Sequence, residues 1–374
     1  MSVASTQVQL SQAQIMAIYN NRFTYARRNT RRVKGRAFSY GNAYTSGVAS
    51  DPLRITTGNF LAGVRVHIHG TVTYTQAATT AAPTLTDAAG LGLISNLAII
   101  GEEEVTPVSL SAWAQEIFRI MAEKADYVSA AVFNLPLANT GSTTVTNTET
   151  VDQWIEFPMV QDFIDLLGIQ NLNNNDINVN VQINWGNFSA AVTLPTGVTA
   201  TQALVADLYA IRYRANKQGT PGPDFSKFYN ALAITRNRAL NAETFDITVN
   251  YKQWITGIQL HVFTASGVLD VNNSLGISSI KVTATAGEVV LLDQDLQDIQ
   301  NENLERYGPP FAAKYQNKGV YILDFPLIRD YIEGARYTDL TITLTMSATP
   351  PAGAQVSAYL QGLANTFPAV PLFI

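Results

Sequence analysis

The sequence contains no cysteine among its 374 residues. Disulfide cross-links, thiolate metal sites and cysteine nucleophiles are therefore excluded. Histidine is almost as scarce, with three residues. No uninterrupted apolar run approaches the roughly 18 residues that a membrane-spanning helix needs, and the first residues lack the apolar core of a signal peptide. We therefore expect a soluble polypeptide that has few of the side chains, cysteine and histidine, that commonly act in catalysis.

Charge is also scarce. Charged residues make up 14% of the chain, against roughly 25% in ordinary soluble domains. Much of the polar surface must therefore come from Asn, Gln, Ser and Thr, which cost less to bury than charged groups. Surfaces that pack against copies of themselves often have this composition, although a Thr-rich secreted sandwich would share it.

The charges that remain are unevenly distributed. Residues 1–50 contain no Asp or Glu but hold seven of the 24 Lys and Arg, so the rest of the chain carries 17 basic against 29 acidic residues, a balance of −12. The basic residues of this segment are Arg22, Arg27, Arg28, Arg31, Arg32, Lys34 and Arg36. We predict a Gln-rich helix over residues 6–28 followed by an extended arm. The arm can contact phosphates of lipid or nucleic acid, or acidic neighbouring subunits.

An internal duplication is the strongest positive signal in the sequence. Four pairs of segments match in the same order: residues 63–68 with 257–262, 93–99 with 276–282, 153–165 with 321–333, and 179–185 with 340–346. The offsets between partners fall steadily from 194 to 161 along the chain. Two copies of one fold that differ by loop insertions in the first copy produce this pattern.

Most of the predicted elements are strands. Residues 64–74, 177–185 and 340–346 alternate between apolar and polar side chains. This period of two places one face of each strand in a core and the other in a polar environment. Strands with few helices between them favour β-sandwiches over a parallel α/β sheet.

Two kinds of helix interrupt these strands. Apolar residues at helical spacing predict a helix over residues 109–123. The other kind is duplicated, because each copy has a strand that ends in Phe-Pro, at Phe157 and Pro158 and again at Phe325 and Pro326. Proline suits the first turn of the short helix expected next, where no amide donor is needed.

A domain map follows from the duplication. Residues 217–224 are rich in Gly and Pro and predict a linker. We therefore expect an N-terminal helix and arm over residues 1–50, a first domain over 51–218 and a second over 224–374. The apolar residues 367–374 are expected to dock on the protein itself or on a neighbour.

The histidines are weak candidates for a metal site. His67 and His69 share one strand face, which is compatible with metal binding, but the sequence indicates no third ligand. His261 stands at the position equivalent to His67, which favours a structural role in both copies. We expect no metal and no cofactor.

The carboxylates are equally weak candidates for catalysis. Acid pairs hydrolyse glycosides, yet runs of acids are more often solvated loops, and two matching acids fit the positive ends of the duplicated helices. No phosphate-binding glycine loop, nucleophile elbow or dinucleotide fingerprint is present. The acids considered are Glu102, Glu103, Glu104, Asp293, Asp295 and Asp298, with Asp162 and Asp330 at the helices.

Taken together, the two Phe-Pro motifs with their helices, the linker at 217–224 and the Gln-rich N-terminus before a basic arm resemble the double jelly-roll major capsid proteins. The nearest in style are the tectivirus-like proteins of tailless icosahedral phages that contain an internal membrane. The resemblance covers residues 51–365. It implies an all-β fold of two tandem eight-stranded jelly rolls.

The resemblance also implies a function. Three chains would form a homotrimer with six similar lobes, a pseudo-hexagonal block that tiles an icosahedral shell beside neighbouring trimers, minor capsid proteins and vertex proteins. The N-terminal residues 6–36 would face inward, toward an internal membrane, without sequence-specific binding to nucleic acid. The segments 76–90 and 137–150 would point outward. Such a protein resides in the virion after assembly in the host cytoplasm, and is not an enzyme.

Two other interpretations remain open. Tandem jelly rolls also occur in glycan- and amide-cleaving enzymes, in which acids meet between the domains; Glu102–Glu104, Glu156 and Asp324 are the residues to test. Alternatively, the chain is a carbohydrate-binding or minor vertex protein of the same virion.

Overall fold

The computed structural model describes most of the chain beyond residue 29. The described residues are 30–33, 35–55, 58–86, 88–101, 107–123, 131–161, 166–172, 179–215, 228–249, 253–266, 269–270, 273–285, 288–315, 318–325, 331–337 and 339–364. The predicted N-terminal helix, the linker and the apolar C-terminal residues lie outside these ranges, so these three predictions and the domain boundary near residue 220 stay predictions.

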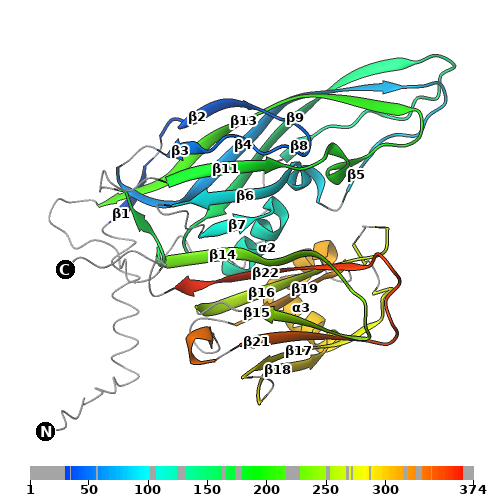
Figure 1. The fold of residues 1–374 in the computed structure, drawn as a ribbon. Coiled ribbons are helices and arrows are strands. Elements are labelled where there is room, and N and C mark those ends of the chain that lie inside the picture. Colours follow the sequence, from blue (N-terminus) through cyan, green and yellow to red (C-terminus); the bar gives the residue numbers. More distant parts are fainter. Residues whose placement is uncertain are drawn as a thin grey trace, which may run out of the picture.

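Two jelly rolls, each made of two facing β-sheets, form the described protein (Figure 1). The tandem all-β architecture predicted from the alternating strands is confirmed. One sheet belongs to the first roll alone, with the order β1–β13–β4–β9–β8, β2 beside β13 and β10 beside β4. We call it the first sheet. Its strands are β1 (Thr30–Val33), β2 (Ser39–Ala43), β4 (Phe60–Gln76), β8 (Ala131–Phe133), β9 (Val145–Pro158), β10 (Gln170–Asn171) and β13 (Val198–Ala215).

A second sheet of nine strands runs through both rolls, in the order β19–β16–β22–β14–β7–β6–β11–β3, with β20 beside β16. The first roll contributes β3 (Leu53–Ile55), β6 (Ile94–Ile100), β7 (Val108–Leu110) and β11 (Val179–Trp185). The second roll contributes β14 (Phe228–Ala239), β16 (Trp254–Phe263), β19 (Val320–Asp324), β20 (Ile332–Glu333) and β22 (Gln355–Ala364). The rolls join where β7 and β14 pair in parallel.

The second roll is closed by a four-stranded sheet in the order β15–β21–β17–β18. Its strands are β15 (Thr244–Val249), β17 (Ile277–Ala284), β18 (Val289–Asp295) and β21 (Leu340–Met346). A small sheet of β5 (Thr84–Leu85) and β12 (Val192–Thr193) and the 3-10 turns η1 (Ala89–Leu93), η3 (Phe188–Ala190) and η4 (Gly334–Arg336) complete the described elements.

The strand pairing confirms that the two rolls are copies of one topology. In the first roll Ile183 pairs with Leu97, and in the second Leu344 pairs with Ile280. These are the residues that the sequence matches align. By the same comparison β4 corresponds to β16, β13 to β22, β6 to β17, and β7 to β18, while β1 and β2 together occupy the place of β14.

The two Phe-Pro motifs, however, are not at equivalent positions. Val64 pairs with Phe157, whereas its counterpart Ile258 pairs with Leu323, two residues before Phe325. A shift of two residues keeps every side chain on the same face of the sheet. Both phenylalanines are therefore still buried, with 0% and 5% exposure, and the sequence match survives the shift.

The proline of the first motif also differs from its predicted role. Pro158 is the last residue of β9 rather than the first residue of a helix, and residues 159–161 form a bend. The chain then turns through Leu166, which has a positive φ of 57°. The predicted helical residues 162–165 lie outside the described part of the chain, as does Pro326.

The first described helix, α2 (Ala112–Glu123), confirms the prediction from apolar spacing. It begins after residue 111 because the preceding residues form β7. The hydroxyl of Ser111 accepts a hydrogen bond from the backbone N–H of Ala114 at 3.2 Å, which caps the first turn. Ile117 and Phe118 are buried.

The second helix, α3 (Leu296–Tyr315), was not predicted. Its residues 296–307 are mostly polar, and its Gly-Pro-Pro sequence at residues 308–310 is typical of a loop. The helix bends there, since Gly308 has a non-helical φ of 81°. Buried residues, among them Leu296, Ile299 and Tyr307, hold it on the second roll. Within the described residues, no helix is long and apolar enough to span a bilayer.

Part of the predicted extended arm belongs to the first sheet. β1 and β2 both pair with β13. The extended conformation is as predicted, but hydrogen bonds to β13 hold these residues on the first roll. The sequence could not reveal this because the partner strand lies more than 160 residues away.

The glycines matched in the duplication supply a test of the packing. A Cβ on Gly63, where φ is 156°, would lie 2.5 Å from the carbonyl oxygen of Phe157. A Cβ on Gly257 would meet the flexible end of Met121 at 2.7 Å. Gly63→Ala should therefore lower the free energy of unfolding by about 2–3 kcal/mol, and Gly257→Ala by about 1 kcal/mol, measured by urea denaturation. Equal losses would contradict this account.

Candidate functional site

The outer face of the first sheet gathers most of the polar chemistry of the first roll. Alternation along β4 buries Val64, Val66 and Ile68, so the residues between them point away from the core. We call this surface the outer face. Its residues are Arg65, His67 and His69 from β4, Asp152, Trp154 and Glu156 from β9, and Asp207 and Tyr209 from β13.

Glu156 is the centre of an ion-pair network on this face. Its carboxylate lies 3.4 Å from Arg32 of β1, 3.3 Å from Arg65 and 3.6 Å from Arg119 of α2. The guanidinium of Arg65 also lies over the ring of Trp154, 4.2 Å from its centroid. Arg119 is 4% exposed. Its buried ion pair with Glu156 therefore connects α2 to β9, and the pair of Glu156 with Arg32 connects β9 to β1.

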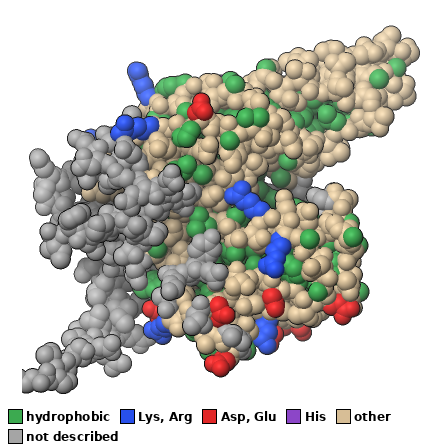
Figure 2. Space-filling model, in the orientation of Figure 1, with side chains coloured by type: hydrophobic (Ala, Val, Ile, Leu, Met, Phe, Trp, Pro, Cys, Tyr) green, Lys and Arg blue, Asp and Glu red, His purple; other side chains and the backbone are tan. Residues whose placement is uncertain are grey.

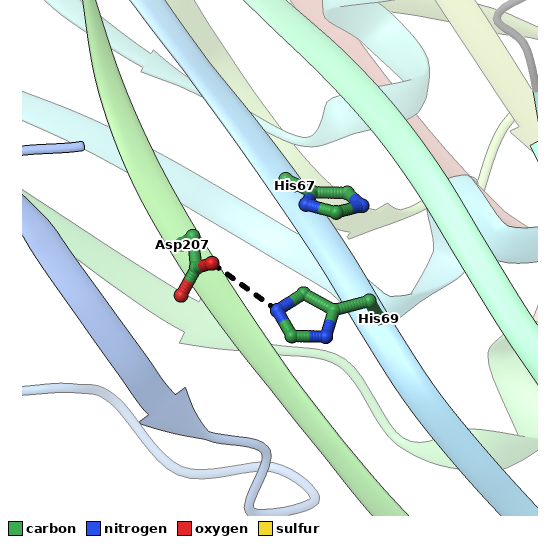
Figure 3. A group of neighbouring side chains, drawn as sticks. All are labelled: His67, His69 and Asp207. Carbon is green, nitrogen blue, oxygen red and sulfur yellow. Dashed lines mark hydrogen bonds and ion pairs between the residues drawn. The ribbon is translucent and has the colours of Figure 1, made fainter. Parts of the chain in front are cut away.

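A second group on the outer face consists of two histidines and two aspartates. His67 Nε2 lies 3.0 Å from Asp152 Oδ1, and His69 Nε2 lies 3.2 Å from Asp207 Oδ2. In Figure 3 the two imidazoles lie side by side on β4, and Asp207 reaches His69 from the neighbouring strand β13. His67 is also stacked on Trp154, with centroids 3.9 Å apart and ring planes 3° apart.

The third potential ligand is the residue that sequence reasoning missed. One ligand atom each from His67, His69 and Asp207 lies within 4.8 Å of the others. Asp207 pairs directly across from His67, although 140 residues separate them in the sequence. Only the register between β4 and β13 brings them together. No pattern within either strand signals this proximity.

The equivalent face of the second roll is buried rather than open. Gly257, Gln259 and His261 take the places of Gly63, Arg65 and His67, and α2 covers them. The contacts include a hydrogen bond of 2.9 Å from Gln259 Nε2 to the carbonyl oxygen of Ala114 and a ring contact of 4.9 Å between His261 and Trp113. One surface of the repeat thus serves as the contact between the rolls.

The two matched histidines therefore have different environments. The side chain of His67 is 17% exposed among charged groups, whereas His261 is 1% exposed. Burial lowers the pKa of His261 to about 3, so this imidazole is neutral in the folded protein. The predicted common structural role applies to His261, but His67 belongs to the polar group on the outer face.

The predicted basic arm is only partly described. Arg31 and Arg32 lie on β1 and are exposed, and Arg36 is exposed beyond it. Arg32 is paired with Glu156 of the same chain. The remaining four, Arg22, Arg27, Arg28 and Lys34, lie outside the described residues.

The carboxylates proposed for catalysis do not form an acid pair in the described residues. Glu156 is paired with arginines, and Asp324 lies 2.7 Å from Arg306 and accepts a hydrogen bond from the hydroxyl of Tyr307 at 2.8 Å. Asp293, Asp295 and Asp298 are exposed on β18 and α3. Glu102–Glu104, Asp162 and Asp330 lie outside the described residues.

The long strands β4, β9 and β13 extend beyond the rest of the first roll (Figure 1). Threonines face one another across this projecting end, for example Thr73 and Thr148, whose hydroxyls are 3.2 Å apart. Figure 2 shows no charged side chain on the visible face of this end. Of the predicted outward loops, residues 145–150 are part of β9, while Leu137 lies in a loop and is 87% exposed.

Comparison with known proteins identifies the architecture. No protein-family model matches the chain, and no curated protein matches it. Among solved structures, the STIV MCP aligns with a TM-score of 0.58 and 16% identity over 91% of this chain and 97% of its own. A chain from Sulfolobus Turreted Icosahedral Virus aligns with a TM-score of 0.59 and 18% identity, over 90% of this chain and 91% of its own.

The Faustovirus major capsid protein aligns with a TM-score of 0.55 and 8% identity over 89% of each chain. At these identities the likeness establishes the fold. The chain has the double jelly-roll fold of these capsid proteins, as the sequence resemblance predicts.

The buried His261 generates a prediction on pH. In the unfolded chain a histidine has a pKa of about 6.5, so between that pH and about 3 the unfolded state binds a proton that the folded state does not. As the pH is lowered through this window, the free energy of unfolding should therefore decrease, by up to about 1.4 kcal/mol per pH unit. Urea denaturation from pH 7 to 5 should show a shallower fall for His261→Gln. An unchanged slope would contradict the assignment.

Proposed function

We propose that this protein is a major capsid protein that assembles as pseudo-hexagonal homotrimers and tiles an icosahedral shell over an internal membrane. The main support for the proposal is that the duplicated segments pair in the same register in both rolls. The matched pairs Ile183 with Leu97 and Leu344 with Ile280 make the two rolls similar lobes of one chain. Three chains then supply six similar lobes, which suits sixfold packing with threefold symmetry.

The contact between the rolls suggests how one chain meets the next. Within the chain, β7 and α2 of the first roll contact β14 and the covered face of β16 in the second. The counterparts of β7 and α2 are β18 and α3, and the counterparts of β14 and β16 are β1 with β2 and the outer face of the first sheet. Repeating the same contact places α3 of one chain on the outer face of the next, and three repeats close a ring.

Exposed residues on these two surfaces fit this arrangement. Val289 and Val290 on β18 are 38% and 52% exposed, and Leu304 on α3 is 37% exposed. These apolar groups would be buried by a neighbouring chain.

Charged side chains also lie on both surfaces. On the face drawn in Figure 2, acidic side chains gather mainly on the second roll. The exposed acids of β18 and α3 are Asp293, Asp295, Asp298, Glu302 and Glu305. The outer face and β1 carry Arg31, Arg32 and Arg65 with the two histidines, beside the acids Asp152, Glu156 and Asp207. Ion pairs between the acids of α3 and the arginines of β1 would fix partner and register at this interface.

Charge reversal on α3 tests both the trimer and its surface. Asp298→Lys with Glu305→Lys should convert trimers into monomers at low salt, because lysines would then face the arginines of the next chain. Light scattering coupled to size-exclusion chromatography measures the change. Glu243→Lys, an exposed acid before β15 that contacts Thr349, is the matched control and should leave the trimer intact.

The outcomes distinguish a failure of the trimer from a failure of α3 as its contact surface. A wild-type protein that stays monomeric at high concentration would contradict the trimer and, with it, the capsid function. A wild-type trimer that survives both reversals would retain the trimer but reject α3 as its contact surface.

We further propose that the N-terminal segment faces inward and contacts the internal membrane. Residues 1–29 hold Arg22, Arg27 and Arg28 and no acid, which suits anionic lipid headgroups. Removal of residues 1–29 leaves β1 in place and should preserve trimers. Binding to anionic vesicles at low salt should fall at least about tenfold, because a juxtamembrane basic residue contributes roughly 1 kcal/mol. A co-sedimentation assay measures it; unchanged binding would remove the lipid contact.

The alternatives have less support. An enzyme needs unpaired carboxylates between the rolls, whereas Glu156 and Asp324 are each paired with arginine. A minor vertex or carbohydrate-binding protein of the same virion would have low copy number, so the amount of this chain in purified particles distinguishes it from the main shell component.

A further inference from the structure

We propose that His67, His69 and Asp207 form a binding site for a divalent transition-metal ion of the zinc class. One ligand atom from each residue lies within 4.8 Å of the other two. Two imidazoles and one carboxylate are a ligand set that Zn²⁺ prefers, and the atoms around a tetrahedral zinc ion lie about 3.4 Å apart. The site would close around an ion by rotation of the side chains of His69 and Asp207, which are partly exposed.

The hydrogen bonds around the three residues leave the right atoms for an ion. His67 Nε2 lies 3.0 Å from Asp152, which leaves Nδ1 of that ring to ligate. The backbone N–H of Gly41 donates to Asp207 Oδ1 at 2.8 Å, which leaves Oδ2 available. Metal-binding histidines commonly hold a carboxylate on the other ring nitrogen, which orients the ring. Asp152 and Gly41 would thus be positioning groups rather than ligands.

His69 already makes the contact that an ion would replace. Its Nε2 lies 3.2 Å from Asp207 Oδ2, and a bound cation would occupy the place of the shared proton. The ring of His67 is stacked on Trp154 with planes 3° apart, so this ligand is held rigidly before binding. His69 is 38% exposed and Asp207 16% exposed. Solvent can therefore reach the site and supply a fourth ligand.

The sheet itself supports the site. His67 and His69 alternate on β4, and β13 places Asp207 directly opposite His67 through backbone pairing. Ligands on paired strands are held more precisely than ligands on loops. All three ligands come from one chain, and in the proposed trimer α3 of the next chain would pack on the same face.

Titration of the full-length protein with zinc chloride tests the proposal. The wild type should bind one Zn²⁺ per chain by isothermal titration calorimetry, and Mg²⁺, which prefers oxygen ligands, should not compete. His69→Gln and Asp207→Asn should each weaken Zn²⁺ binding by roughly 100-fold, and Asp152→Asn by about tenfold. Asp246→Asn, an exposed strand aspartate that accepts a hydrogen bond from Thr343, is the matched control and should bind as the wild type does.

Two further measurements make the result decisive. Thermal melting without metal should be alike for control and ligand variants, which shows that each variant is folded. Co²⁺ bound to the wild type should give the intense visible absorption of a tetrahedral site, and this absorption should disappear in His69→Gln. Wild-type affinity in the ligand variants, or no saturable Zn²⁺ binding by the wild type, would overturn the proposal.

Discussion

The parallel pairing of β7 with β14 is the constraint on which the rest of the molecule depends. It joins one half of the first roll to one half of the second in a single sheet, and so fixes the position of the second roll. Residues from both rolls, such as Phe118 and Tyr359, consequently share one apolar core. The helix α2 is held between the rolls and covers the face of β16 that would otherwise be open.

Because the rolls are copies, each of the two surfaces in this contact has a counterpart on the other roll, and the chain does not bring these two counterparts together. The outer face of the first sheet corresponds to the face that α2 covers, and β18 with α3 corresponds to β7 with α2. A sheet whose equivalent surface is buried in the second roll remains open in the first. Its counterpart is buried by a contact between the rolls, which is why a second copy of the chain is the partner that we propose.

The same outer face holds the proposed metal site, and the comparison of the copies explains why only the first roll has it. At the position of His67, the second roll has a histidine enclosed by aromatic side chains, with Trp113 at 4.9 Å and Tyr359 at 4.8 Å. Burial keeps that imidazole neutral. Within one chain the matched position is therefore covered in the second roll and open in the first.

The sequence by itself determined the all-β class, the two copies and the helix α2, because these depend on periodicity and local similarity within single segments. It could not predict α3, which begins with a mostly polar segment and contains a Gly-Pro-Pro bend. Nor could it predict the two-residue offset of the Phe-Pro motifs, which leaves the pattern of faces unchanged. Only the tertiary structure decided that Asp207 joins His67 and His69, and that β1 belongs to the first sheet. Both depend on hydrogen-bonded register between strands far apart in the chain, which no local pattern specifies.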